Sequence, residues 1–160
     1  MKTTSQNKIP CDKVLDEVGG KLDSGKYNSA LKILLDNLDR CTDNARYHAY
    51  IGFAYFHLGR YQKAIKFFDK ALELEPCASN TLFLRARCKD ELDMTEDAKV
   101  DYRLVLKLDP KAKDAHFYLG LLEDMDNNIT EAIKLFEQAL EIDPKDQEAR
   151  EMLAILKKSP

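Results

Sequence analysis

The sequence predicts an all-α protein in which helical hairpins stack on one another as an α-solenoid. Three observations support this prediction: the composition favours helix, a pattern of 34 residues recurs along the chain, and each recurrence holds two amphipathic segments. Gly and Pro disfavour helix interiors, and only six Gly and five Pro occur among the 160 residues. With 44% hydrophobic and 33% charged residues, the chain has the composition of a globular domain.

The 34-residue period is clearest at Pro76, Pro110 and Pro144, which end the phrases ALELEP, VLKLDP and ALEIDP. Two further rows with this spacing each hold one physical type, small in the first and large and apolar in the second: Gly52, Ala86 and Gly120; and Leu34, Phe68, Tyr102 and Phe136. Small residues allow two helix axes to approach closely, and large ones fill the grooves beside the contact. Proline lacks an N–H and crowds the turn before it, so each proline is predicted to end a second helix.

Each period is predicted to form a helical hairpin. Residues 47–57 and 62–75 place apolar side chains three or four residues apart, a spacing typical of amphipathic helices. A short break separates the two segments, and the residues at the equivalent breaks all tolerate the left-handed backbone that ends many helices: Gly25, Gly59, Asp93 and Asn127.

A 34-residue helix-turn-helix unit with this pattern of small, aromatic, alanine and proline positions resembles the tetratricopeptide repeat. Four such units are expected, the first divergent and the others closer to the family pattern: residues 11–44, 45–78, 79–112 and 113–146. The chain departs from the pattern at four positions. Arg85 stands where the family prefers Leu, Lys89 where it prefers Tyr, Val18 in the small row, and Thr42 in place of the first proline.

A capping helix is expected over residues 147–158, where Ala149, Met152, Leu153 and Leu156 form one apolar stripe. A stacked array leaves its last hydrophobic face open, and a solitary amphipathic helix covers that face. One domain over residues 11–158 is therefore expected, between tails of residues 1–10 and 159–160.

Charge and hydropathy argue against two classes of partner. The net charge is −3 and the isoelectric point is near 5.7, so no global basic field favours nucleic acid. No apolar stretch approaches the length of a membrane span, so membrane insertion is not expected.

The four cysteines, Cys11, Cys41, Cys77 and Cys88, form no CxxC pair and do not reach the density of a disulfide scaffold. All four are therefore expected to be free thiols, which suits a cytoplasmic protein in a reducing compartment.

Binding is expected on a concave surface lined by the first helix of each unit, because stacked hairpins rotate slightly from one to the next. The expected groove residues lie on the face of each first helix that the second helix leaves open: Leu15, Arg46, Ala49, Tyr50, Phe53, His57, Asn80, Phe83, Arg87, Asp114, Phe117, Tyr118, Leu121 and Met125. Aromatic and aliphatic side chains along a groove suit an amphipathic helix or an apolar extended segment. Arg46 and Arg87 favour an acidic group on the partner, unless Asp90 and Asp114 neutralise them.

Many tetratricopeptide domains grip chaperone tails with a two-carboxylate clamp that needs Lys, Asn and Arg side chains. This chain offers no cation at the equivalent places in either of two registers, which hold Leu15, Gly19, Tyr50, Asn80 and Leu84, or Ala49, Phe53, Leu84, Asp114 and Tyr118. The clamp is therefore not expected.

Neither catalysis nor a cofactor or metal site is expected, since the chain has no phosphate loop, no HExxH and no nucleophile motif. His48 and His116 are expected to be half-buried packing residues. The resemblance implies a protein-interaction module or adaptor that binds a peptide or helix of a partner protein. Two alternatives stay open: a small chaperone similar to those of type III secretion, which shield apolar segments, and a structural scaffold that self-associates as a weak homo-oligomer.

Overall fold

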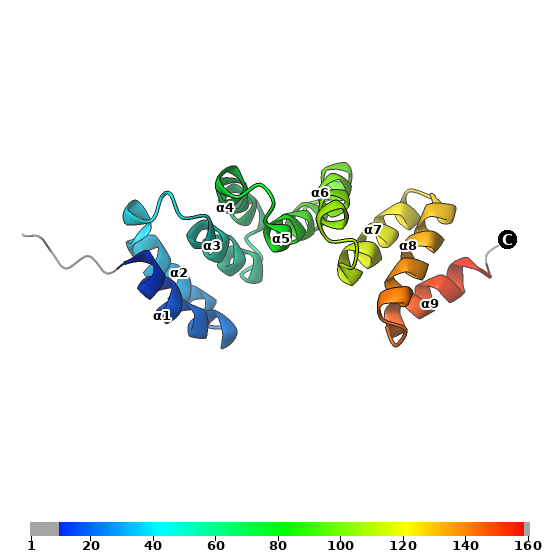
Figure 1. Cartoon of the computed structure of the whole chain (residues 1–160), viewed down its shortest axis with the longest axis horizontal. Coiled ribbons are helices and arrows are strands. Elements are labelled where there is room, and N and C mark those ends of the chain that lie inside the picture. Colours follow the sequence, from blue (N-terminus) through cyan, green and yellow to red (C-terminus); the bar gives the residue numbers. More distant parts are fainter. Residues whose placement is uncertain (1–9, 159–160) are drawn as a thin grey trace, which may run out of the picture. The chain divides into compact units, whose positions relative to one another are not determined.

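The computed structural model describes residues 10–158, which are helical and contain no strand (Figure 1). The helices are α1 (Cys11–Asp23), α2 (Tyr27–Asp36), the short 3-10 helix η1 (Leu38–Arg40), α3 (Ala45–His57), α4 (Tyr61–Leu74), α5 (Ser79–Asp90), α6 (Thr95–Leu108), α7 (Lys113–Met125), α8 (Ile129–Ile142) and α9 (Gln147–Leu156). This confirms the prediction of an all-α helical repeat. The expected tails fall outside the described residues, apart from Pro10.

The chain divides into two compact units, with the boundary between residues 76 and 77. The first unit holds the hairpins α1–α2 and α3–α4, with α2 packed on α3. The second unit holds the hairpins α5–α6 and α7–α8, with α6 packed on α7, and α9 packs on α8 at its end. The helix expected over residues 147–158 is therefore present and covers the last hairpin.

The four predicted turns are formed as the sequence indicates. Gly25, Gly59, Asp93 and Asn127 all have φ between 57° and 72°, in the left-handed region. In each turn the next residue donates its N–H to a carbonyl oxygen five residues earlier, as in the bond from Arg60 to Tyr55 at 2.9 Å. These bonds satisfy carbonyl groups that the end of the first helix leaves without partners.

The small and large rows meet as predicted. A Cβ atom added at Gly52 would lie 2.6 Å from the ring of Phe68, and one added at Gly120 would lie 2.9 Å from the ring of Phe136. Both rings are fully buried. In the hairpins α3–α4 and α7–α8 the two helices therefore come together where glycine leaves room for the phenyl ring of the partner helix.

The two departures from the family pattern in α5 are explained by one buried carboxylate in α6. Asp101 is 1% exposed and accepts two hydrogen bonds from Arg85 and one from Lys89, each 2.8 Å long. Two cations thus compensate one carboxylate between α5 and α6. In the preceding hairpin the equivalent positions hold the apolar residues Ile51, Tyr55 and Phe67.

A second buried network joins α6 to α7. Lys99 pairs with Asp126 and, at 3.2 Å, with Glu123, and both Lys99 and Glu123 are buried. Glu123 also accepts hydrogen bonds from Arg103 at 2.6 Å and from Asn128 at 2.7 Å. Burial acts to raise the pKa of Glu123, but the hydrogen bonds from Asn128 and Lys99 hold it below its usual value.

The expectation that all four cysteines are free thiols is wrong for two of them. Cys11 and Cys41 form a disulfide, whereas Cys77 and Cys88 remain free. Cys11 and Cys41 are 30 positions apart in the sequence, and the hairpin between them returns the chain to its starting point and brings the two ends together. The thiol argument for a reducing compartment therefore does not hold.

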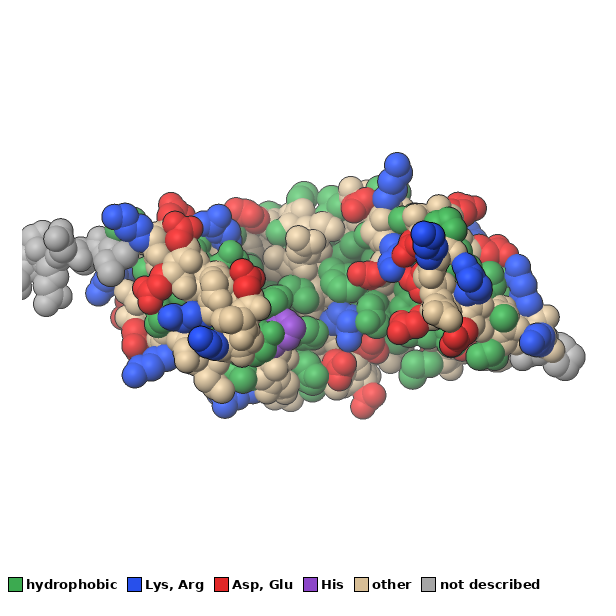
Figure 2. Space-filling view, turned by 90° about the horizontal axis from the view of Figure 1, so that it is seen from below, with side chains coloured by type: hydrophobic (Ala, Val, Ile, Leu, Met, Phe, Trp, Pro, Cys, Tyr) green, Lys and Arg blue, Asp and Glu red, His purple; other side chains and the backbone are tan. Residues whose placement is uncertain are grey.

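The surface is charged, with both signs present. Figure 2 shows acidic and basic side chains interspersed over one face of the molecule, in keeping with the small net charge of −3. Across residues 10–158, none of the helices has both the length and the apolar character that a membrane span requires.

Candidate peptide-binding face

The expected groove residues of the second unit lie on α5 and α7. Three of them are exposed, namely Asn80, Asp114 and Met125. The others are half-buried: Phe83, Arg87, Phe117, Tyr118 and Leu121. Half-buried rings are partly fixed by packing and still present one surface to a ligand, so this face suits recognition of apolar side chains.

A cluster of aromatic rings forms the centre of this face. The ring of Phe83 lies 5.9 Å from that of Tyr118, and both rings rest on Tyr102 of α6, at 5.8 Å and 6.1 Å between centroids. Tyr102 is completely buried, and burial raises the pKa of its phenol. Because α6 supplies the buried ring, the second helix of the hairpin orients the two half-buried rings of Phe83 and Tyr118.

Arg87 adds a fixed cation to this cluster. Its guanidinium carbon lies 4.0 Å from the centroid of the Tyr118 ring, a cation–π contact, and its Nη2 is 3.7 Å from the carboxylate of Glu91. The Nε atom is buried and makes no hydrogen bond within residues 10–158. Nearby, burial raises the pKa of Asp90, while the charge of Arg87 acts in the opposite direction.

A small hollow of about 280 Å³ brings three expected residues together. Asn80 and Phe83 line it from α5, and Asp114 lines it from the start of α7. Lys113 also lines it, and its ammonium lies 2.8 Å from Asp146. The hydrogen bond from Lys113 lowers the pKa of Asp146, so this pair is charged and holds α7 to the start of α9.

Phe117 and Leu121 continue the same face of α7 from Asp114 towards Met125. Phe117 lies 5.7 Å from the buried ring of Phe136, and both Phe117 and Leu121 pack against the core formed by α8 and α9. Met125 is the most exposed of the large hydrophobic residues described, at 73%. The face therefore runs from the hollow at Asn80 to the exposed Met125 thioether.

In the first unit, one expected groove residue is not available. Leu15 is 1% exposed and belongs to the core between α1 and its neighbours, so its assignment to the groove is corrected. Arg46 is exposed and lies 3.4 Å from Asp12 of α1, while Ala49 and Tyr50 are half-buried on α3.

Phe53 and His57 of α3 are covered in part by Tyr27, at the start of α2. The His57 ring stacks on Tyr27 at 4.5 Å and meets Phe53 at 4.4 Å, and burial lowers the pKa of His57. Tyr27 begins α2, a second helix, and therefore lies outside the first-helix faces that the sequence pattern assigns to the groove. The sequence does place an aromatic residue, Tyr27, two positions after the turn glycine Gly25, which indicated a ring at the start of the second helix.

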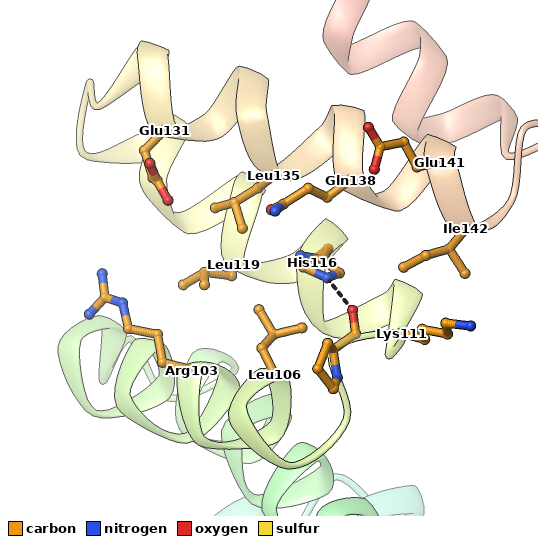
Figure 3. A pocket seen from close by; sticks show the side chains of 11 residues that line it. Arg103, Leu106, Lys111, His116, Leu119, Glu131, Leu135, Gln138, Glu141 and Ile142 are labelled. Carbon is orange, nitrogen blue, oxygen red and sulfur yellow. Dashed lines mark hydrogen bonds between the residues drawn. The ribbon is translucent and has the colours of Figure 1, made fainter.

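A larger hollow of about 780 Å³ lies between α6 and α8, with α7 as its floor (Figure 3). Leu106, Leu119, Leu135 and Ile142 supply its apolar part. In the first unit the place of Leu135 is taken by Phe67, which stacks on His48 and Tyr55 at 6.1 Å and 5.7 Å. Leucine is smaller than phenylalanine, so Leu135 fills less of this space than a phenylalanine would, and the 34-residue pattern did not indicate the hollow.

His48 and His116 are more buried than expected, at 3% and 7% exposed. Each donates from Nε2 to a backbone carbonyl oxygen, that of Thr42 at 2.7 Å and that of Pro110 at 3.0 Å (Figure 3). These hydrogen bonds therefore stabilise the loop before α3 and the loop before α7, respectively.

Family models of the tetratricopeptide repeat match residues 45–76 and 95–147, together more than half of the chain. A search of curated proteins found no match. Among solved structures, MamA from Desulfovibrio magneticus RS-1 is similar at a TM-score of 0.84 and 22% identity, covering 91% of this chain and 82% of that one. A tetratricopeptide repeat protein from Parabacteroides merdae ATCC 43184 has a TM-score of 0.81 and 27% identity, covering 92% of this chain and 59% of that one.

The first tetratricopeptide domain of Spaghetti (RPAP3), solved with an HSP90 peptide, is also similar. Its TM-score is 0.69 at 25% identity, and the match covers 73% of this chain and 93% of that one. Repeats of this kind generally serve as protein-interaction modules. From its repeats, its helical hairpins and these matches, the chain belongs to the tetratricopeptide repeat family.

Proposed function

We propose that the protein is an adaptor, and that the face formed by α5 and α7 binds an apolar segment of a partner protein that carries an acidic group. The observation that supports this proposal is the cluster of Phe83, Tyr118 and Arg87. Two half-buried rings rest on the buried Tyr102, and the Arg87 guanidinium lies 4.0 Å above one of them. Apolar anchors and a cation are thus presented side by side.

The binding energy comes mainly from the apolar anchors. Burying one aliphatic or aromatic side chain of the partner contributes about 1.5–3 kcal/mol before the cost of ordering it. Three or four such anchors support micromolar affinity. Arg87 adds specificity, because its pairing with Glu91 at 3.7 Å is loose and a carboxylate of the partner makes a stronger charge-assisted bond.

The proposed ligand is not the two-carboxylate tail that a clamp recognises. The places of the Lys, Asn and Arg residues of the clamp hold Ala49, Phe53, Leu84, Asp114 and Tyr118, or Leu15, Gly19, Tyr50, Asn80 and Leu84 in the other register. A pair of carboxylates meets no pair of cations there. One acidic group next to apolar residues suits Arg87 and the rings around it better.

The proposal is tested by affinity purification with mass spectrometry, comparing the wild type with the double variant Phe83→Ala, Tyr118→Ala. The variant is expected to lose the proteins that the wild type captures. Val100→Ala with Leu104→Ala is the matched control, because it removes two exposed aliphatic side chains from α6. If the Phe83→Ala, Tyr118→Ala variant has the same unfolding temperature as the wild type and still captures the same proteins, the proposal is wrong.

Arg87 is tested separately on the partner identified in that way. Arg87→Gln is expected to weaken binding roughly tenfold or more, the effect of losing a charge-assisted hydrogen bond. The loss should disappear when the acidic residue of the partner is also neutralised. Equal weakening with either form of the partner would show that Arg87 supports the rings and does not contact the ligand.

Two measurements distinguish the other functions considered from the sequence. A chaperone is required for the solubility of its client when the two are co-expressed, whereas an adaptor is not. A self-associating scaffold shows a sedimentation coefficient that rises with protein concentration.

A further inference from the structure

Helix α1, the first helix in the described part of the chain, is joined to its unit by a covalent bond. Cys11 is the first residue of α1, and Cys41 is buried in the segment between η1 and α3. Their disulfide ties the beginning of the first hairpin to its end. Figure 1 shows α1, in dark blue, lying along α2.

Besides its buried apolar side chains, α1 makes few polar contacts with its neighbours. Its N-cap residue is Pro10, and no side chain caps its first turn. Its one ion pair to another helix in the described residues joins Asp12 to Arg46 at 3.4 Å, and both side chains are more than half exposed. Exposed pairs of this kind contribute little to stability.

The terminal helix at the other end of the chain is held in a different way. In α9 the side chain of Asp146 caps the first turn by accepting from the N–H of Ala149, and it also pairs with Lys113 at 2.8 Å. Lys157 pairs with Glu137 of α8 at 2.7 Å. Helix α9 thus has a side-chain cap and two ion pairs, whereas α1 adds one exposed ion pair and the disulfide to its apolar packing.

We propose that the Cys11–Cys41 pair is a redox switch that controls whether α1 stays docked on α2 and α3. In the oxidised form the disulfide keeps α1 in place. A cellular thiol reductant supplies two electrons and two protons, the S–S bond breaks, and two cysteine thiols form while the reductant becomes a disulfide. Cys11 is half-buried and Cys41 is buried, so the proposal places the attack of the reductant at the sulfur of Cys11.

Reduction then lets α1 separate from its unit. The buried side chains of α1 are Val14, Leu15, Val18 and Leu22, and they cover the apolar side of the α2–α3 pair. The released form exposes that side to other proteins. This inference does not rest on the function proposed for α5 and α7, because α1, α2 and α3 all belong to the first unit.

Hydrogen exchange of the full-length protein tests the switch. Protein purified without reductant should contain two free thiols, and reduced protein should contain four. Removing the constraint of a 30-residue loop is expected to speed exchange of the α1 amides roughly 100-fold. Exchange in α9 should stay the same, and reoxidation should restore the slow exchange of α1.

Two variants complete the test. Cys11→Ser with Cys41→Ser should show fast exchange in α1 that no longer responds to reductant. Cys77→Ser with Cys88→Ala keeps the disulfide and should respond as the wild type does. Four free thiols in the unreduced wild type, or an exchange rate in α1 that reduction changes less than threefold, would overturn the proposal.

Discussion

The buried Asp101 gives the sharpest prediction about how this fold is stabilised. Its carboxylate accepts three hydrogen bonds of 2.8 Å, two from Arg85 and one from Lys89. Replacing Asp101 with Asn keeps the shape of the side chain and removes its charge. The two cations then remain between α5 and α6 with their side chains only 18% and 14% exposed.

The expected loss of stability follows from these contacts. An Asn oxygen in the place of Oδ2 still accepts from Arg85 Nε and Lys89 Nζ, but through bonds to a neutral acceptor. The third bond, from Arg85 Nη2, is lost because the amide NH2 is itself a donor, and a hydrogen bond between charged groups contributes about 1.5–3 kcal/mol. Removing one partner of a buried ion pair costs about 3–5 kcal/mol, because the remaining charge is poorly solvated. We therefore expect Asp101→Asn to lower the free energy of unfolding by about 3–5 kcal/mol.

A triple variant supplies the matched control. Arg85→Ile, Lys89→Tyr and Asp101→Phe together install the apolar set that the α3–α4 hairpin carries at Ile51, Tyr55 and Phe67. Exchanging a buried ionic cluster for packed apolar residues is often neutral or stabilising. The free energy of unfolding of the triple variant is therefore expected to equal or exceed that of the wild type, with any loss below about 1.5 kcal/mol.

The measurement is urea unfolding followed by circular dichroism, with hydrogen exchange of the α5 and α6 amides as a local probe. The local probe is needed because the chain has two compact units, which can unfold separately. If Asp101→Asn changes the stability of α5 and α6 by less than about 1 kcal/mol, the reasoning about the buried ion pairs of Asp101 is refuted.

Three further predictions concern the second unit. Gly120→Leu should cost about 3 kcal/mol or more, since its side chain overlaps the ring of Phe136, and wild-type thermal stability would contradict this packing. Because Glu123 and Asp146 have lowered pKa values when folded, their stabilisation is complete above their ordinary pKa values of 4.5 and 3.8 and is lost as the pH falls further. Glu123→Gln should therefore flatten the decline of stability below pH 4.5, and an unchanged slope would argue against the α6–α7 network. Removal of residues 147–160 uncovers Phe136 and should cause self-association in sedimentation experiments, whereas a monomer of unchanged stability would show that α9 is not a cap.

The sequence by itself determined the repeating architecture. The period of 34 residues, the left-handed turn positions and the pairing of Gly52 and Gly120 with large apolar residues were all readable, and the structure confirms them. These features depend on local physics. Helix periodicity, turn conformation and the exclusion of proline from helix interiors are set by residues close together in the chain.

The tertiary structure decided which distant side chains meet. It paired Cys11 with Cys41, gave Arg85 and Lys89 a common carboxylate, and buried Leu15. The spacing along one helix shows that residues share a face, but it does not show which neighbouring helix covers that face. That outcome depends on how the hairpin returns the chain and on the size of the facing side chain, as the hollow beside Leu135 illustrates where the other unit has Phe67.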